Sequence, residues 1–164
     1  MTDAAGARRD AELGARLLRY WQRLRTMPGG RWLFSRLIGR MVPYSGTIRA
    51  DVLVLERGRA LLRMRDRRGL RNHLRSVHAI ALANLGELAS GLAASVALPP
   101  GLRGIPTAIN IAYHRKARGP LTAEGTAVIP PVADVGEAVA EAQISNAAGE
   151  VVATVRVLWQ LERV

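Results

Sequence analysis

An apolar stretch from Ala79 to Leu98 dominates this chain, and it carries a single acid, Glu87, at its middle. Because apolar residues occur almost all round the helix that this stretch would form, the sequence predicts a buried helix rather than an amphipathic surface helix. An ionised glutamate inside a domain costs several kcal/mol unless it is paired or protonated. This acid therefore indicates either a functional site or a buried structural pair.

The spacing between His78 and Glu87 sets a second constraint. Nine residues correspond to about 900° of helical rotation, so the two side chains point from opposite faces of one helix. One chain cannot bring them together. A shared site therefore predicts a dimer, in which Glu87 of one subunit faces Asn72 and His78 of the partner subunit.

Length and composition narrow the function further. The 164 residues are the size of one domain with a real core, and the chain has no cysteine. Disulfides, thiolate catalysis and cysteine-ligated zinc are excluded, and three scattered histidines without paired carboxylates make a poor metal site. The first twelve residues lack the apolar core of a signal peptide, which favours a cytoplasmic location.

The net charge of +11 comes almost entirely from arginine, since Lys116 is the only lysine. Such a surface attracts anions, whether nucleic acid, acidic lipid headgroups or coenzyme phosphates. The chain has only seven aromatic residues and no recognised base-stacking or groove-reading motif, so we expect no nucleic acid among its partners.

Residues 1–43 are predicted to form a tail and amphipathic helices. After a mobile tail over residues 1–8, apolar residues from Leu13 to Leu24 recur at helical spacing among arginines, up to a turn at 28–30. This helix either packs across the outside of the domain or binds a membrane surface, as basic amphipathic helices also do. A second short helix is predicted over 31–42.

Residues 44–164 are predicted to form one α+β domain. Alternating apolar residues predict a hairpin over 48–66, then comes the long helix, which Pro99-Pro100-Gly101 ends. Further strands are predicted over 107–116, 121–128, 137–145 and 150–161, with a hairpin turn at 146–149. The economical architecture is a curved antiparallel sheet wrapped around one long central helix.

The long helix also has the length of a membrane span. Its central acid and its many alanine, serine and glycine residues oppose insertion, and its flanks are rich in strands. We therefore expect no transmembrane segment.

The order of these elements, together with Asn72, His78 and Glu87, resembles the hotdog fold, in particular acyl-CoA thioesterases of the phenylacetate-pathway type, over residues 44–162. A closer similarity, to an uncharacterised bacterial family of hotdog domains with a proposed thioesterase assignment, is carried by Asn72-His73, Ser76-Val77-His78, Gly86-Glu87, Tyr113 and Lys116-Ala117-Arg118-Gly119. Ala79 stands where thioesterase relatives commonly have glycine, and Arg75 where the closer family often has it.

The resemblance implies a homodimer, or a tetramer, that hydrolyses an acyl thioester such as acyl-CoA without a cofactor. Glu87 would be the general base or nucleophile, and His78 and the Ala79 backbone amide would lie by the carbonyl. Asn72 would orient groups around the substrate carbonyl, or its side chain would cap its own loop. A carboxylate with a raised pKa and helix amides aimed at an oxyanion suit this chemistry, and Ser76 would cap that helix.

Substrate contacts are predicted on three segments. Small residues on the Glu87 side, including Ala83, leave room for a partner helix or an acyl chain. Asn84 contacts substrate, or holds Glu87 or a nearby carbonyl. A cationic turn at 116–119 binds coenzyme A phosphates or is simply solvated. The predicted substrate-binding residues are Asn84, Ser90, Gly91, Thr107, Asn110, Lys116 and Arg118.

Two other functions on the same fold are considered. The alternative is a non-catalytic acyl-CoA or lipid-binding hotdog protein, which would bind its ligand without turnover. A dehydratase is disfavoured, because the proline-rich loop expected of acyl-carrier dehydratases is missing around His78.

Overall fold

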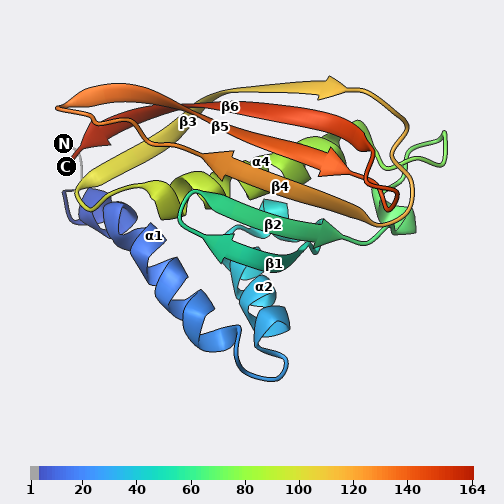
Figure 1. Cartoon of the computed structure of the whole chain (residues 1–164), viewed down its shortest axis with the longest axis horizontal. Coiled ribbons are helices and arrows are strands. Elements are labelled where there is room, and N and C mark those ends of the chain that lie inside the picture. The colour runs from blue at the N-terminus through green and yellow to red at the C-terminus, as the bar shows by residue number, and fades with distance from the viewer. Residues whose placement is uncertain (1–3) are drawn as a thin grey trace.

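Six antiparallel strands form one sheet that curves around a central helix (Figure 1). The computed structural model describes residues 4–164, with side chains from residue 12 onward. The strand order β1-β2-β4-β5-β6-β3 leaves β1 and β3 at the two edges. This is the hotdog fold that the sequence resemblance implies. The strands are β1 Asp51–Glu56, β2 Arg59–Met64, β4 Leu121–Ala127, β5 Val135–Ser145, β6 Val151–Arg163 and β3 Leu102–Tyr113.

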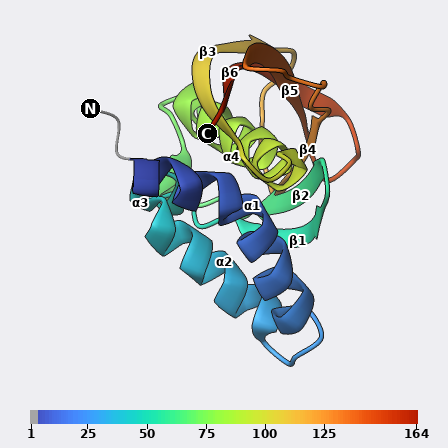
Figure 2. The ribbon, with the colours of Figure 1, turned by 90° about the vertical axis from the view of Figure 1, so that its left-hand side faces the viewer.

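The central helix α4, Ala79–Ala97, lies within the curve of the sheet (Figure 2). His78 caps its amino end, because Nδ1 of the ring accepts a hydrogen bond of 3.1 Å from the Ile80 amide. The prediction of Ser76 as the cap was wrong, since Ser76 lies in the preceding loop. Among the described residues α4 alone has the length and hydropathy of a membrane span, and here it is the core helix of the sheet.

Two glycines let α4 lie directly on the sheet. A methyl group on Gly86 would overlap the side chain of Val155 in β6. A methyl group on Gly125 in β4 would overlap the backbone of Ala89. Neither position has room for any side chain, so the close approach of helix and sheet depends on both glycines.

The helices α1, Ala4–Leu24, and α2, Gly30–Met41, form a hairpin outside the sheet. Trp21 of α1 and Phe34 of α2 are buried and meet edge to face, with ring centroids 5.2 Å apart. Packing across the outside of the domain is therefore what α1 does. Residues 4–8 are helical, in contrast to the predicted tail, and residues 1–3 lie outside the described part of the chain.

Several elements differ from the predicted ones, among them the short 3-10 helix Arg68–Leu70, which was not predicted. The short helix α3, Pro43–Gly46, follows α2 without having been predicted. Strand β3 begins at Leu102, earlier than the predicted start at Thr107, and continues through Pro106. Because β3 is an edge strand with a register shift between Pro106 and Ala108, it tolerates a proline that would break a central strand.

Candidate active site

One face of α4 remains partly uncovered in the single chain. We define the open face of α4 as Ile80, Ala83, Glu87 and Gly91. These residues recur at helical spacing, and each is exposed or part-exposed. The edge strand β3 exposes Ile105 and Ile109. The sequence predicted a buried helix, whereas the chain alone leaves apolar surface on both α4 and β3.

Glu87 lies in the middle of the open face as an isolated acid. No described residue donates a hydrogen bond to its carboxylate or forms an ion pair with it, and burial raises its pKa above the ordinary value of 4.5. The structural alternative of a buried ion pair therefore has no partner among the side chains of residues 12–164. A carboxylate whose pKa is raised by burial is a stronger base than an exposed carboxylate.

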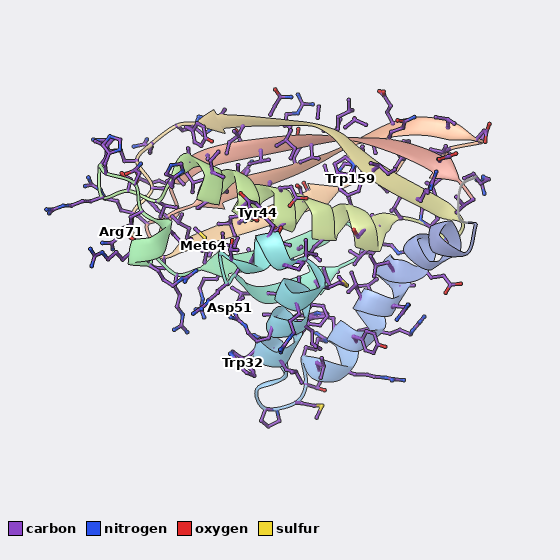
Figure 3. All side chains as sticks on the ribbon, turned by 180° about the vertical axis from the view of Figure 1, so that it is seen from behind. Trp32, Tyr44, Asp51, Met64, Arg71 and Trp159 are labelled. Carbon is purple, nitrogen blue, oxygen red and sulfur yellow. The ribbon has the colours of Figure 1, made fainter. Side chains whose placement is uncertain are left out.

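Trp159 lies close to Glu87, between α4 and the sheet (Figure 3). A methyl group on Gly91 would lie 3.5 Å from Oε1 of Glu87 and 3.9 Å from Cζ2 of Trp159, so the missing side chain keeps this corner open. The indole is 7 % exposed, and its Nε1 has no acceptor among the described residues. A buried donor without a partner is rare and points to a ligand or another group that supplies one.

Trp159 is the site residue that sequence reasoning missed. The alternation of β6 does place it on the inward face, with Val155, Val157 and Leu161. Its indole is the only N–H donor among these inward side chains. That single exception in an otherwise aliphatic row was the signal available in the sequence.

The loop before α4 holds its own shape through Asn72. Its Oδ1 accepts hydrogen bonds from the amides of Leu74, at 2.9 Å, and Ser76, at 3.2 Å. The side chain thus caps the loop, the alternative considered from the sequence. Arg75 has a φ of 55°, a left-handed conformation that favours glycine. The hydroxyl of Ser76 is buried without a partner among the described residues.

A groove of about 340 Å³ runs past the amino end of α4. Ala79 and Tyr113 lie in its wall, and the Tyr113 hydroxyl donates to the Ala79 carbonyl at 3.2 Å. The Ala79 amide has no acceptor within the described chain, so a donor is available at a positive helix end. Arg115 and Lys116 add positive charge to the wall.

Asp66 accepts hydrogen bonds from both loops that flank this groove, the loop that contains Arg71 and the loop that contains Gly119. Its side chain is 8 % exposed and accepts hydrogen bonds from Nε of Arg71, at 2.7 Å, and from the Gly119 amide, at 2.9 Å. The Arg71 hydrogen bond is the main reason why the pKa of Asp66 lies below its usual value. The hydrogen bond from Gly119 to Asp66 therefore anchors the cationic turn at 116–119, whose Lys116 and Arg118 side chains are exposed.

Four other predicted residues have partners within the chain or lie on the edge strand. Asn84 is buried and donates to the Tyr44 carbonyl at 3.4 Å. Ser90 is fully buried and donates to the Gly86 carbonyl at 2.9 Å, so it offers a ligand no surface in this chain. Thr107 donates to the Leu158 carbonyl at 3.3 Å, and Asn110 is exposed on β3.

The single chain thus holds two separate groups of candidate residues. Glu87, Gly91 and Trp159 lie together near the middle of α4. Ala79 and Lys116 lie by the groove at its amino end. Eight residues separate Ala79 from Glu87, which is about 12 Å along the axis of a helix. One thioester carbonyl cannot contact both in the same chain.

Comparisons with known proteins agree with this fold. The family model described as Domain of unknown function (DUF4442) matches residues 30–161. No curated protein matches the sequence.

Solved structures extend the likeness over most of the chain. A structural-genomics protein named APC5556 is 26% identical and covers 93% of this chain and 99% of its own, with a TM-score of 0.79. A probable thioesterase from Pseudomonas aeruginosa is 24% identical, covering 84% of this chain and 97% of its own, with a TM-score of 0.65. A thioesterase from Haemophilus influenzae is 16% identical, covering 73% and 82%, with a TM-score of 0.62.

Proposed function

The chain belongs to the DUF4442 family, and from the geometry of its site we propose that it hydrolyses acyl thioesters, with acyl-CoA as the substrate class. The observation that carries the proposal is Glu87, an unpaired, part-buried carboxyl group of raised pKa on the open face of the core helix. The thioesterase names of proteins similar in fold support the same reaction.

The active unit is a dimer. In an antiparallel pair of α4 helices whose two-fold axis passes near Ala83, Glu87 of one subunit lies opposite Ala79 of the partner subunit, since both are four residues from Ala83. Alanine at the crossing point allows a short distance between helix axes. The partner also covers the apolar residues that one chain leaves exposed on α4 and on the edge strand β3.

In this arrangement Glu87 starts the reaction as a carboxylate. It removes a proton from water that attacks the thioester carbonyl, or it attacks that carbonyl itself as nucleophile. The backbone amide of the partner subunit's Ala79 donates to the developing oxyanion, aided by the helix dipole. The carbon–sulfur bond then breaks, and when Glu87 acts as base the thiolate takes back the proton that Glu87 removed from water and leaves as the thiol. When Glu87 acts as nucleophile, the same bond breakage leaves an acyl–Glu87 anhydride. A water molecule then hydrolyses this anhydride, which restores the carboxylate, releases the acid and supplies the proton for the thiol.

The remaining residues bind and orient the substrate. The groove past Ala79 holds the pantetheine arm, and Lys116 and Arg118 contact coenzyme phosphates as exposed cations of the anchored turn. The indole N–H of Trp159, which has no acceptor within the described chain, donates to the acyl substrate beside Glu87. Asn72 acts indirectly, by holding the shape of the loop before α4.

The test measures thiol release from short-chain, long-chain and aromatic acyl-CoA, with wild type and Glu87→Gln at matched folding. We expect the variant to lose turnover by about 10²–10⁴-fold, the usual contribution of an acid–base group. Glu137→Gln is the matched control, because it makes the same change at an exposed glutamate of β5. Wild type that binds acyl-CoA but releases no thiol would instead identify the alternative, a non-catalytic acyl-CoA or lipid-binding protein.

A further inference from the structure

The α1–α2 hairpin carries an unusual concentration of positive charge. Residues 13–41 of this hairpin contain seven arginines and neither aspartate nor glutamate. The hairpin extends away from the sheet, and its connecting loop lies at the far end from strand β3 (Figures 1 and 2). The dimer contact proposed on α4 and β3 therefore leaves this loop uncovered.

The end of the hairpin also exposes large apolar side chains. We define the hairpin tip as residues 25–33. Within it Met27 is 57 % exposed, Trp32 is 62 % exposed and Leu33 is 42 % exposed. Trp32 is the only exposed tryptophan, because Trp21 and Trp159 are buried. Figure 3 shows Trp32 on α2, far from Trp159.

Arginines surround these apolar residues. Arg23, Arg25 and Arg31 are all exposed, and none of them pairs with an acid among the described residues. A surface that combines apolar side chains, an interfacial tryptophan and unpaired arginines has the chemistry of proteins that bind at the headgroup level of a bilayer.

We propose that the hairpin tip docks on a bilayer that contains anionic phospholipids. Met27 and Trp32 enter the boundary between headgroups and acyl chains, while Arg23, Arg25 and Arg31 contact lipid phosphates. Charge complementarity selects this occupant. A second copy of the chain would bring two acid-free arginine clusters together, which opposes self-association at the tip.

The test is flotation of the full-length protein with vesicles of phosphatidylcholine alone or of phosphatidylcholine and phosphatidylglycerol in equal parts. We expect flotation only with the mixed vesicles, and weaker flotation as salt rises. Brominated acyl chains should quench part of the tryptophan emission, because Trp32 alone reaches them. No flotation of wild type at low salt would overturn the proposal.

Three variants separate tip docking from general attraction of a basic protein. Arg23→Ser/Arg25→Ser/Arg31→Ser should weaken binding by about 100-fold, since each arginine near an anionic surface contributes roughly fivefold. Met27→Ser/Trp32→Ser keeps the charge and should still weaken binding at least tenfold. The matched control, Arg63→Ser/Arg68→Ser/Arg156→Ser, removes equal charge from exposed positions elsewhere and should bind nearly as wild type.

The same set defines the contrary results. If the control variant lost as much vesicle binding as the tip variant, the attraction would depend on net charge alone and not on the tip. Wild-type binding by Met27→Ser/Trp32→Ser would show that the apolar tip takes no part. A shift of that variant from dimer to monomer in size-exclusion chromatography would make the tip an interface between copies. All the substituted side chains are exposed, so melting temperatures should stay close to that of wild type.

Discussion

At the scale of single residues, the site depends on groups that the fold leaves without partners. Glu87 has a raised pKa because it is buried without a cation, and the indole N–H of Trp159 is buried without an acceptor. Both are costs to stability that a better-paired core would avoid. Their position beside Gly91, where a side chain is missing, is consistent with stability given up for substrate binding.

The first prediction concerns the stability of Glu87→Gln. Because folding raises the pKa of Glu87, the folded state favours its protonated form. The contribution of Glu87 to stability is therefore greatest below the unfolded pKa, and it is lost as pH rises through the folded value. Urea unfolding should show Glu87→Gln at least as stable as wild type at pH 7, with a smaller advantage at pH 4. Loss of stability at pH 7 would mean that Glu87 has a structural partner.

A second residue-scale prediction concerns Trp159→Phe. This change keeps an aromatic ring and removes the unpartnered N–H, but it leaves a small cavity, so the unfolding free energy should fall by about 1–3 kcal/mol. Turnover should fall at least tenfold, because the indole N–H donates to the substrate. The pH profile of kcat/KM should shift in the same variant if the donor acts on Glu87. Unchanged turnover and profile would confine Trp159 to packing.

The sequence singled out Glu87 because it is a single charge in an apolar run, and its catalytic role stays a prediction. It predicted the helix cap badly, because Ser76 has a common capping side chain whereas the actual cap uses the ring nitrogen of His78. Asn72 was left open between two roles, and the hydrogen bonds from Leu74 and Ser76 show that its side chain caps the loop, whereas its role at the site stays a prediction. Trp159 could not be predicted as a neighbour of Glu87, because the two lie close only once α4 packs against β6. That packing joins residues distant in sequence.

At the scale of elements, the amino end of α4 is held by loops rather than by regular structure. Val77 donates to the Ala117 carbonyl at 2.8 Å, and Asp66 links Arg71 to Gly119. Alternation and turn residues predicted the strands themselves. The start of β3 was missed, because a proline is compatible with a strand only at an edge, and edge position is a property of the whole sheet.

Asp66→Asn tests this anchoring. The lowered pKa means that Asp66 contributes stability above its unfolded pKa and loses that contribution as pH falls through the folded value. At pH 7 the variant should be measurably less stable, because the charged hydrogen bond from Arg71, which lies at the surface, is lost together with part of the bond from the Gly119 amide. The difference should vanish well below pH 3.8, where wild type is protonated as well. A difference independent of pH would contradict this role.

At the scale of the whole molecule, the chain holds two groups of candidate residues whose separation along α4 is about 12 Å. The helical spacing of His78 and Glu87 predicted from sequence that one chain could not form the site alone. The hotdog sheet, the open face of α4 and the exposed edge strand are all compatible with a second subunit. Subunit mixing provides a direct test of a site formed across the dimer.

Ala79→Pro is suited to that test. Proline is tolerated at the first position of a helix, His78 before it already has the extended conformation that proline requires, and the only group lost is the Ala79 N–H. Ala79→Pro and Glu87→Gln should each be folded and inactive. In a mixed dimer, one of the two sites combines an intact Glu87 with an intact Ala79.

The decisive measurement is therefore the thiol-release rate after the two inactive variants are unfolded together, refolded in equal amounts and compared with each variant treated alone. Random pairing makes half of the dimers mixed, so about one quarter of wild-type activity should return if the site is shared between subunits. If mixing restores nothing although mixed dimers form, or if Ala79→Pro alone retains full activity, the proposed shared site is wrong.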